Sequence, residues 1–89
     1  MITSKAIAES FSALSHPSRV DILLALMPHA MTGITTGDLA KKTNIPPSTL
    51  AHHLREMEQG QVIQRQADGR KTLLRPNTRR LADIATLIT

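Results

Sequence analysis

The fold is decided by residues 36–59, which read TGDLAKKTNIPPSTLAHHLREMEQ. Their pattern predicts one short helix over 36–43 and a longer one over 47–59, separated by a tight turn at 43–46. Gly60 follows the second helix, where glycine is the residue expected just past a helix C-terminus. Two short helices joined in this way form a helix-turn-helix unit.

The second of these helices has two different faces. Its apolar residues Leu50, Leu54 and Met57 recur at i, i+4 and i+7 and predict a buried stripe, with His53 on or beside it. The opposite face is small or hydrogen-bonding and mostly uncharged, as a helix in the DNA major groove requires. That face carries Ser48, Thr49, His52, Arg55, Glu56 and Gln59.

A β-hairpin is predicted after the helix-turn-helix unit. Strands over 62–66 and 71–75 flank an Asp68-Gly69 pair, which is a strong hairpin signal. Arg70 and Lys71 lie at the tip, where such a wing reaches the phosphate backbone or the minor groove. A hairpin tip is also where solvated charges normally lie, so both interpretations stay open.

Three further helices complete the predicted fold. The chain should form an amphipathic helix over about 3–14, a central and buried helix over 17–27, and a last helix over about 78–89. Ile34 could form a short strand. We therefore expect residues 1–89 to make one domain, mainly α with a small β-hairpin wing: a winged helix-turn-helix with five helices.

The composition excludes several classes of protein. The 89 residues include one Phe, no Tyr and no Trp, which argues against base stacking on aromatic platforms. Cysteine is absent, so there is no disulfide, thiolate zinc site or redox thiol. No run of about 18 apolar residues exists and the N-terminal stretch lacks a signal-peptide pattern, so we expect a cytoplasmic protein that does not enter a membrane.

The charge balance points to a polyanionic partner. Eleven basic residues face seven acidic ones, a net charge of +4. Within 65–80 a single acid, Asp68, accompanies six basic residues. Such a cluster suggests nucleic acid, although a solvated surface is the plainer alternative. The six are Arg65, Arg70, Lys71, Arg75, Arg79 and Arg80.

Neither catalysis nor a metal site is predicted. The sequence has no nucleophile elbow, no phosphate-cradling glycine loop and no plausible carboxylate pair, so we expect no enzyme and no cofactor. His52 and His53 are adjacent, so their side chains diverge on a helix and cannot both bind one metal ion. Met27, His29 and Met31 would suit Cu(I), but methionine at a buried helix end is more often core filler.

Five stretches match the pattern of a known family: ALSHPSRVDIL (13–23), DLA (38–40), STLAHHL (48–54), GQVI (60–63) and DGR (68–70). Together they make the chain resemble the ArsR/SmtB family of small winged-helix transcriptional repressors. The similarity covers about residues 13–75 by motif and the rest by the order of helices.

The resemblance implies a homodimer whose first and last helices pack against the partner. Two recognition helices would then enter successive major grooves of a palindromic operator, about 34 Å apart. The terminal helices carry more apolar residues than a chain of this length easily hides, although these could simply close the core. They are Ile7, Phe11, Leu81, Ile84, Leu87 and Ile88.

The chain departs from the family at its sensing sites. The paired cysteines of arsenic, cadmium and lead sensors are replaced by residues 35–37, Thr-Thr-Gly, and the last helix has Asp83 but no His for zinc or cobalt. Pro46 stands where a capping Ser is usual and Leu74 where Tyr is common. Any effector is therefore unknown.

These observations predict a sequence-specific, double-stranded DNA-binding regulator, most simply a repressor. Ser48, Thr49 and His52 are expected to contact bases or phosphates, and Arg55 a phosphate. For His53 we expect packing or a phosphate contact rather than a contact with a base. Wing contacts are expected from Arg70 and Lys71. The alternative is a winged-helix protein-interaction module or antitoxin-like subunit that reads no operator.

Overall fold

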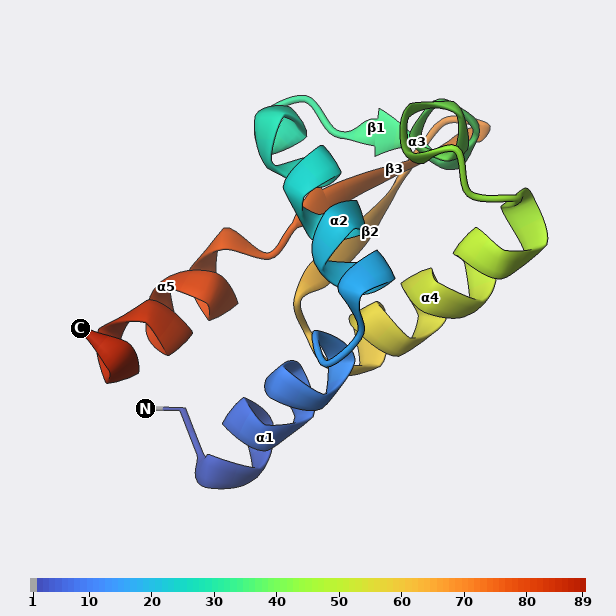
Figure 1. Ribbon diagram of the computed structural model, residues 1–89. Helices are drawn as coiled ribbons and strands as arrows, with labels where there is room; N and C mark the ends of the chain where they lie inside the picture. Colours follow the sequence, from blue (N-terminus) through green and yellow to red (C-terminus); the bar gives the residue numbers. More distant parts are fainter. Residues whose placement is uncertain (1) are drawn as a thin grey trace.

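The computed structural model describes residues 2–89 and confirms a mainly α architecture with a small β wing (Figure 1). The helices are α1 (Ser4–Ala13), α2 (Pro17–Leu26), the 3-10 helix η1 (Met27–His29), α3 (Thr36–Thr43), α4 (Pro47–Gln59) and α5 (Thr78–Ile88). The strands are β1 (Ile34–Thr35), β2 (Ile63–Asp68) and β3 (Lys71–Pro76). The helix-turn-helix unit is formed by α3 and α4. Figure 1 shows α1 and α5 at the end of the molecule that holds both termini.

The three strands form one antiparallel sheet in the order β1-β3-β2. The hairpin turn is tighter than predicted, because Asp68 pairs with Lys71 and leaves only Gly69 and Arg70 in the loop. Gly69 has a φ of +61°, as the first loop position of a two-residue hairpin allows for glycine. On the other side of β3, Ile34 pairs with Leu74 and so fastens the sheet to the start of α3.

The core lies between α2, α3, α4 and the sheet. As predicted, Leu50, Leu54 and Met57 on α4 are at most 1% exposed. They belong to a single cluster of buried apolar side chains that includes Ala13, Ile22, Leu26, Ile34, Leu39, Val62, Ile63 and Leu74. Because no aromatic ring contributes, this cluster is built from aliphatic side chains and methionine. No helix among residues 2–89 is long and apolar enough to cross a membrane.

The prediction that α2 is buried nearly all round was wrong. Ile22 and Leu26 are fully buried, but Leu24 is 63% and Val20 40% exposed. The helix packs against α3 and β3 along one side only. The buried stripe of α2 therefore consists of positions 19, 22 and 26, and it begins with an arginine, Arg19.

Threonine and asparagine side chains begin three of the helices. The Thr3 Oγ1 accepts a hydrogen bond from the Ala6 N–H at 3.1 Å, and the Thr35 Oγ1 from the Asp38 N–H at 3.2 Å. Asn77 caps α5 by accepting from the Arg80 N–H. Pro46 gives α4 no side-chain cap, as its sequence predicted.

Gly60 ends α4 as predicted, but not because it is left-handed. Its φ is −80°, and the positive φ belongs to the next residue, Gln61. A Cβ at Gly60 would lie 2.4 Å from the Cβ of Ala13 and 2.8 Å from the carbonyl oxygen of Glu9. Glycine is therefore required because α1 passes directly over the end of α4.

We predict that Gly60→Ala destabilises the protein by about 1–3 kcal/mol, because the added methyl group overpacks a rigid backbone contact. Gly37→Ala is the matched control: its Cβ would meet nothing within 4 Å, and it lies in a helix with ordinary φ. It should be neutral or stabilise by about 0.5–1 kcal/mol. Urea unfolding of both variants checks this, and equal stabilities would contradict it.

Candidate nucleic-acid interface

The face of α4 opposite the core is exposed and polar. Ser48, Thr49, His52 and Arg55 are all exposed, and Gln59 continues this face toward the C-terminal end. Hydroxyl, imidazole and guanidinium groups thus point outward from one side of a helix whose other side is fixed in the core. Because α4 has no side-chain cap, the N–H groups of its first turn are left for water or for an anion such as phosphate.

The wing adds two cations at a second position. Arg70 and Lys71 are exposed at the hairpin tip, one in the loop and one at the first position of β3. Neither makes a salt bridge, since the ion pair found among the described residues joins Arg65 to Glu58. Both charges are free to meet a phosphate.

The remaining basic residues of 65–80 do not form one patch with the tip. Arg65 donates two hydrogen bonds to the Glu58 carboxylate, at 3.0 and 2.8 Å, and Arg75 donates to Gln66 across the hairpin. Arg80 is half-buried between α5 and α1. β-pairing and helix packing thus give these side chains different neighbours.

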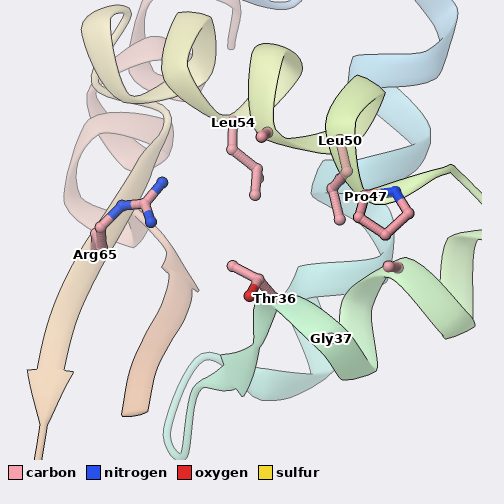
Figure 2. A pocket seen from close by; sticks show the side chains of 8 residues that line it. Thr36, Gly37, Pro47, Leu50, Leu54 and Arg65 are labelled. Atoms are coloured by element: carbon pink, nitrogen blue, oxygen red, sulfur yellow. The ribbon is translucent and has the colours of Figure 1, made fainter. Parts of the chain in front are cut away.

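A cleft of about 320 Å³ lies between α3, α4 and β2. Figure 2 shows the lining residues contributed by α3, α4 and β2: Thr36, Gly37, Ala40, Pro47, Leu50, Ala51, Leu54 and Arg65. Most of these side chains are apolar, and the guanidinium of Arg65 is already held by Glu58. The lining offers no pair of titratable groups of the kind that general acid–base catalysis uses.

His53 is held from inside the protein rather than presented to solvent. It is half-buried, and its Nδ1 accepts a hydrogen bond from the Nε–H of Arg19 at 3.1 Å. Burial lowers the pKa of His53, and the charges of Arg19, His52 and His16 lower it further. The ring is therefore neutral at neutral pH, with Nδ1 as its acceptor. The sequence predicted packing or a phosphate contact for this residue. The contact with Arg19 inside the protein occupies Nδ1, one of its two ring nitrogens.

The C-terminal end of α4 is bound by both terminal helices. The buried Ser10 on α1 donates to the Gly60 carbonyl at 2.6 Å and accepts from the Arg80 guanidinium of α5 at 3.0 Å. Asn77 donates to the Gln61 carbonyl at 2.8 Å. These side chains satisfy carbonyl groups that a helix end leaves without partners. None of them was predicted; the signal available was a serine inside the apolar stripe of the first helix.

The apolar residues of the terminal helices are only partly covered. Phe11 is 48%, Leu87 56% and Ile88 75% exposed. Ile7 and Leu81 are half-buried, and Ile84 is buried within the chain itself. The free apolar surface on α1 and α5 thus comes mainly from Phe11, Leu87 and Ile88.

The structure places no metal-binding cluster among residues 2–89, where no three His, Cys, Asp or Glu side chains come together. The His52 and His53 rings diverge, with centroids 6.0 Å apart and tilted by 47°. Met27 and Met31 are 42% and 89% exposed, so their interpretation as core filler was wrong. The chain turns outward after α2, which takes both thioethers away from the core.

An α3–α4 unit followed by a three-stranded sheet with a projecting hairpin defines a winged helix-turn-helix domain. A helix-turn-helix domain family model matches residues 14–66, and the chain belongs to that family. No curated protein matches the chain.

Solved structures with similar folds support this assignment. An ArsR-like transcriptional regulator from Rhodococcus has a TM-score of 0.83 and 23% identity, over 94% of this chain and 76% of that one. The homodimeric winged helix-turn-helix DNA-binding domain of a possible ArsR-family regulator from Mycobacterium bovis has a TM-score of 0.77 and 20% identity, over 94% and 75%. A predicted DNA-binding transcriptional regulator from E. coli is 32% identical, over 85% and 79%, with a TM-score of 0.69. The fold that the resemblance to the ArsR family implied is confirmed.

We predict that Ser10→Ala destabilises the protein by about 1–3 kcal/mol, because the buried Gly60 carbonyl loses its donor and Arg80 loses an acceptor. Ser12→Ala changes the same side chain at an exposed position of α1 and should stay within about 0.5 kcal/mol of the parent. Thermal unfolding distinguishes the two. A Ser10→Ala variant as stable as Ser12→Ala would show that the contact adds nothing.

Proposed function

We propose that the protein is a homodimeric transcriptional repressor that binds a palindromic operator in double-stranded DNA. The observation that carries this proposal is the exposed face of α4, where Ser48, Thr49, His52 and Arg55 project from a helix anchored at its other side. Hydroxyl and imidazole groups can hydrogen-bond base edges or phosphates in the major groove, while Arg55 suits a phosphate.

The wing supplies sequence-independent affinity in this proposal. Arg70 and Lys71 lie at the exposed hairpin tip, without acidic partners within salt-bridge distance. Cations of this kind gain affinity by releasing counterions from the DNA, so binding should weaken steeply as salt rises. His53 contributes its packing against Arg19, with Nε2 as the only ring nitrogen left for a DNA contact.

The dimer is supported by the free apolar surface of the terminal helices and by the homodimeric neighbour from Mycobacterium bovis. A two-fold axis through α1 and α5 would place two copies of α4 on half-sites about 34 Å apart. The sensing ligands of metal- and thiol-responsive relatives have no counterpart here, since residues 35–37 hold no cysteine and α5 holds no histidine.

The direct test is selection of bound duplexes from a random library by the purified protein at two salt concentrations. Enrichment of one inverted repeat supports the proposal. The absence of DNA binding even at low salt would refute it and favour a protein-interaction module on the same fold.

We predict that Arg70→Ala and His52→Ala weaken binding in different ways. Arg70→Ala should lower affinity for selected and random duplexes alike and reduce the salt dependence, because it removes a phosphate contact. His52→Ala should cost about 1–3 kcal/mol on the selected duplex and much less on random DNA, because it removes a base contact. Gel shifts on both duplexes measure this. Equal losses on both for His52→Ala would end its role in sequence recognition.

We also predict that Leu87→Asp dissociates the dimer into folded monomers. The side chain is 56% exposed in the single chain, so the charge costs little within one protomer but is buried unpaired in the proposed interface. Met31→Asp, at an apolar side chain that is 89% exposed and lies off the terminal helices, is the control. Sedimentation velocity should find a dimer for the parent and for Met31→Asp. A dimer of Leu87→Asp would move the interface elsewhere.

A further inference from the structure

Arg19 is a buried cation whose partners are unusual. Its side chain is 7% exposed, and its guanidinium donates to the His53 Nδ1 at 3.1 Å and to the Ala13 carbonyl at 3.5 Å. Among the described residues no carboxylate lies within salt-bridge distance of it. The charge is instead balanced by a carbonyl at the C-terminal end of α1, where the helix dipole is negative, and by a neutral imidazole.

This arrangement joins three helices at one point. Arg19 belongs to α2, Ala13 ends α1, and His53 lies on α4 next to His52 on the exposed face. The Arg19 hydrogen bond reaches the middle of α4, whereas Arg65 binds Glu58 in its last turn and Ser10 and Asn77 bind carbonyls beyond that turn. This bond therefore acts with the buried stripe of Leu50, Leu54 and Met57 to set the orientation of the exposed face about the axis of α4.

We propose that the Arg19–His53 hydrogen bond is a proton-sensitive positioning contact for α4, closed while His53 is neutral and opened when its Nδ1 takes a proton. This inference rests on the proposed function in one respect: the opening is expected to lower affinity for DNA. Both residues are positioning residues here, acting on DNA through the placement of α4.

The Arg19–His53 hydrogen bond can form only while Nδ1 of His53 carries no proton. The Nδ1 lone pair that accepts the Arg19 Nε–H is the same lone pair that binds the proton, so the two cannot coexist. Protonation would also place an imidazolium about one hydrogen-bond length from a guanidinium in a partly buried site, where the repulsion between two positive charges is poorly screened.

The neighbouring charges all act in the same direction on His53. Arg19 and His16 face it from α2 and the residue that precedes α2, and His52 adjoins it on α4; each disfavours the imidazolium, as does burial. Two acidic groups, Glu9 of α1 and Glu56 of α4, line a cleft together with Arg19, and neither forms a salt bridge with it. The pKa of His53 accordingly lies below the ordinary 6.5, so the contact is closed at neutral pH and opens only as the solution becomes acidic.

The predicted pH dependence of DNA affinity has the opposite sign to that of a histidine that contacts DNA directly. A histidine that touches phosphate binds DNA more tightly when it becomes cationic. The positioning contact predicts weaker binding on acidification, and a shift of one pKa unit between the closed and open forms corresponds to about tenfold in affinity.

The contact itself is tested without DNA, by following the histidine ring nitrogens and the Arg19 Nε–H of the whole protein by NMR. At neutral pH His53 should be the Nε2–H tautomer, and the Arg19 signal should change at the pH at which His53 titrates. Arg19→Met should raise the pKa of His53 if the variant folds. A His53 titration that leaves the Arg19 signal unchanged would overturn the proposal.

The effect on DNA is tested with a labelled duplex of random sequence and with the best duplex from the library selection, from about pH 7.5 to about pH 5.5. Relative to His53→Asn, which keeps an acceptor near the Nδ1 position but cannot titrate, the parent should lose affinity on the order of tenfold on acidification. His29→Gln, a histidine on η1 that contacts Lys42, is the control and should keep the parent's loss.

The outcomes separate this inference from the proposed function. Parallel pH profiles for the parent and His53→Asn would overturn the effect on DNA. Failure of the parent to bind either duplex at any pH would refute the proposed function and this effect together, while the NMR titration still decides whether the contact responds to protons.

Discussion

The close passage of α1 over the end of α4 is the constraint on which the rest of the structure depends. Gly60 leaves no room for a Cβ, and the buried Ser10 donates to its carbonyl at 2.6 Å. Because this contact fixes the C-terminal end of α4, the chain reverses at Gln61 with a positive φ and enters β2 in a set register. The hairpin and the exposed face of α4 are thus oriented by the same close contact, which the Arg80 guanidinium reinforces through the Ser10 hydroxyl.

Charge is distributed differently from what a basic C-terminal half suggests. Arg65 is paired with Glu58, Arg80 serves the α1–α5 packing, and Arg19 is buried without a carboxylate. The cations left free near the wing are few and lie at its tip. In the proposed complex these cations would add affinity for any duplex, and the mostly uncharged face on α4 suits recognition by hydrogen-bond geometry.

The sequence predicted the elements far better than the contacts between them. Periodicity at Leu50, Leu54 and Met57 located α4 and its buried face, because one stripe of a helix must meet the core whatever covers it. Periodicity alone could not show that Leu24 is exposed, since an all-apolar helix does not reveal which side lacks a neighbour. The roles of Ser10, Arg19 and Asn77 depend on residues 50, 34 and 16 positions away along the chain, respectively. Such pairs leave no local pattern, apart from a polar residue standing in an apolar stripe.

The helices that are expected to form the dimer are also those that hold α4. α1 carries the exposed Phe11 and, one position earlier, the Ser10 that binds the end of α4; α5 carries the exposed Leu87 and Ile88 and begins at the Asn77 that binds Gln61. A partner packed on α1 and α5 would therefore contact the helices that bind the end of α4, and not α4 itself. In the proposed dimer, the separation of the two recognition helices is set through these hydrogen bonds, so a small rotation of α1 or α5 changes the match to a fixed operator spacing. The hydrogen bonds of Ser10 and Asn77 are therefore the contacts that respond most to a change at the dimer interface, because hydrogen-bond geometry tolerates less displacement than apolar packing does.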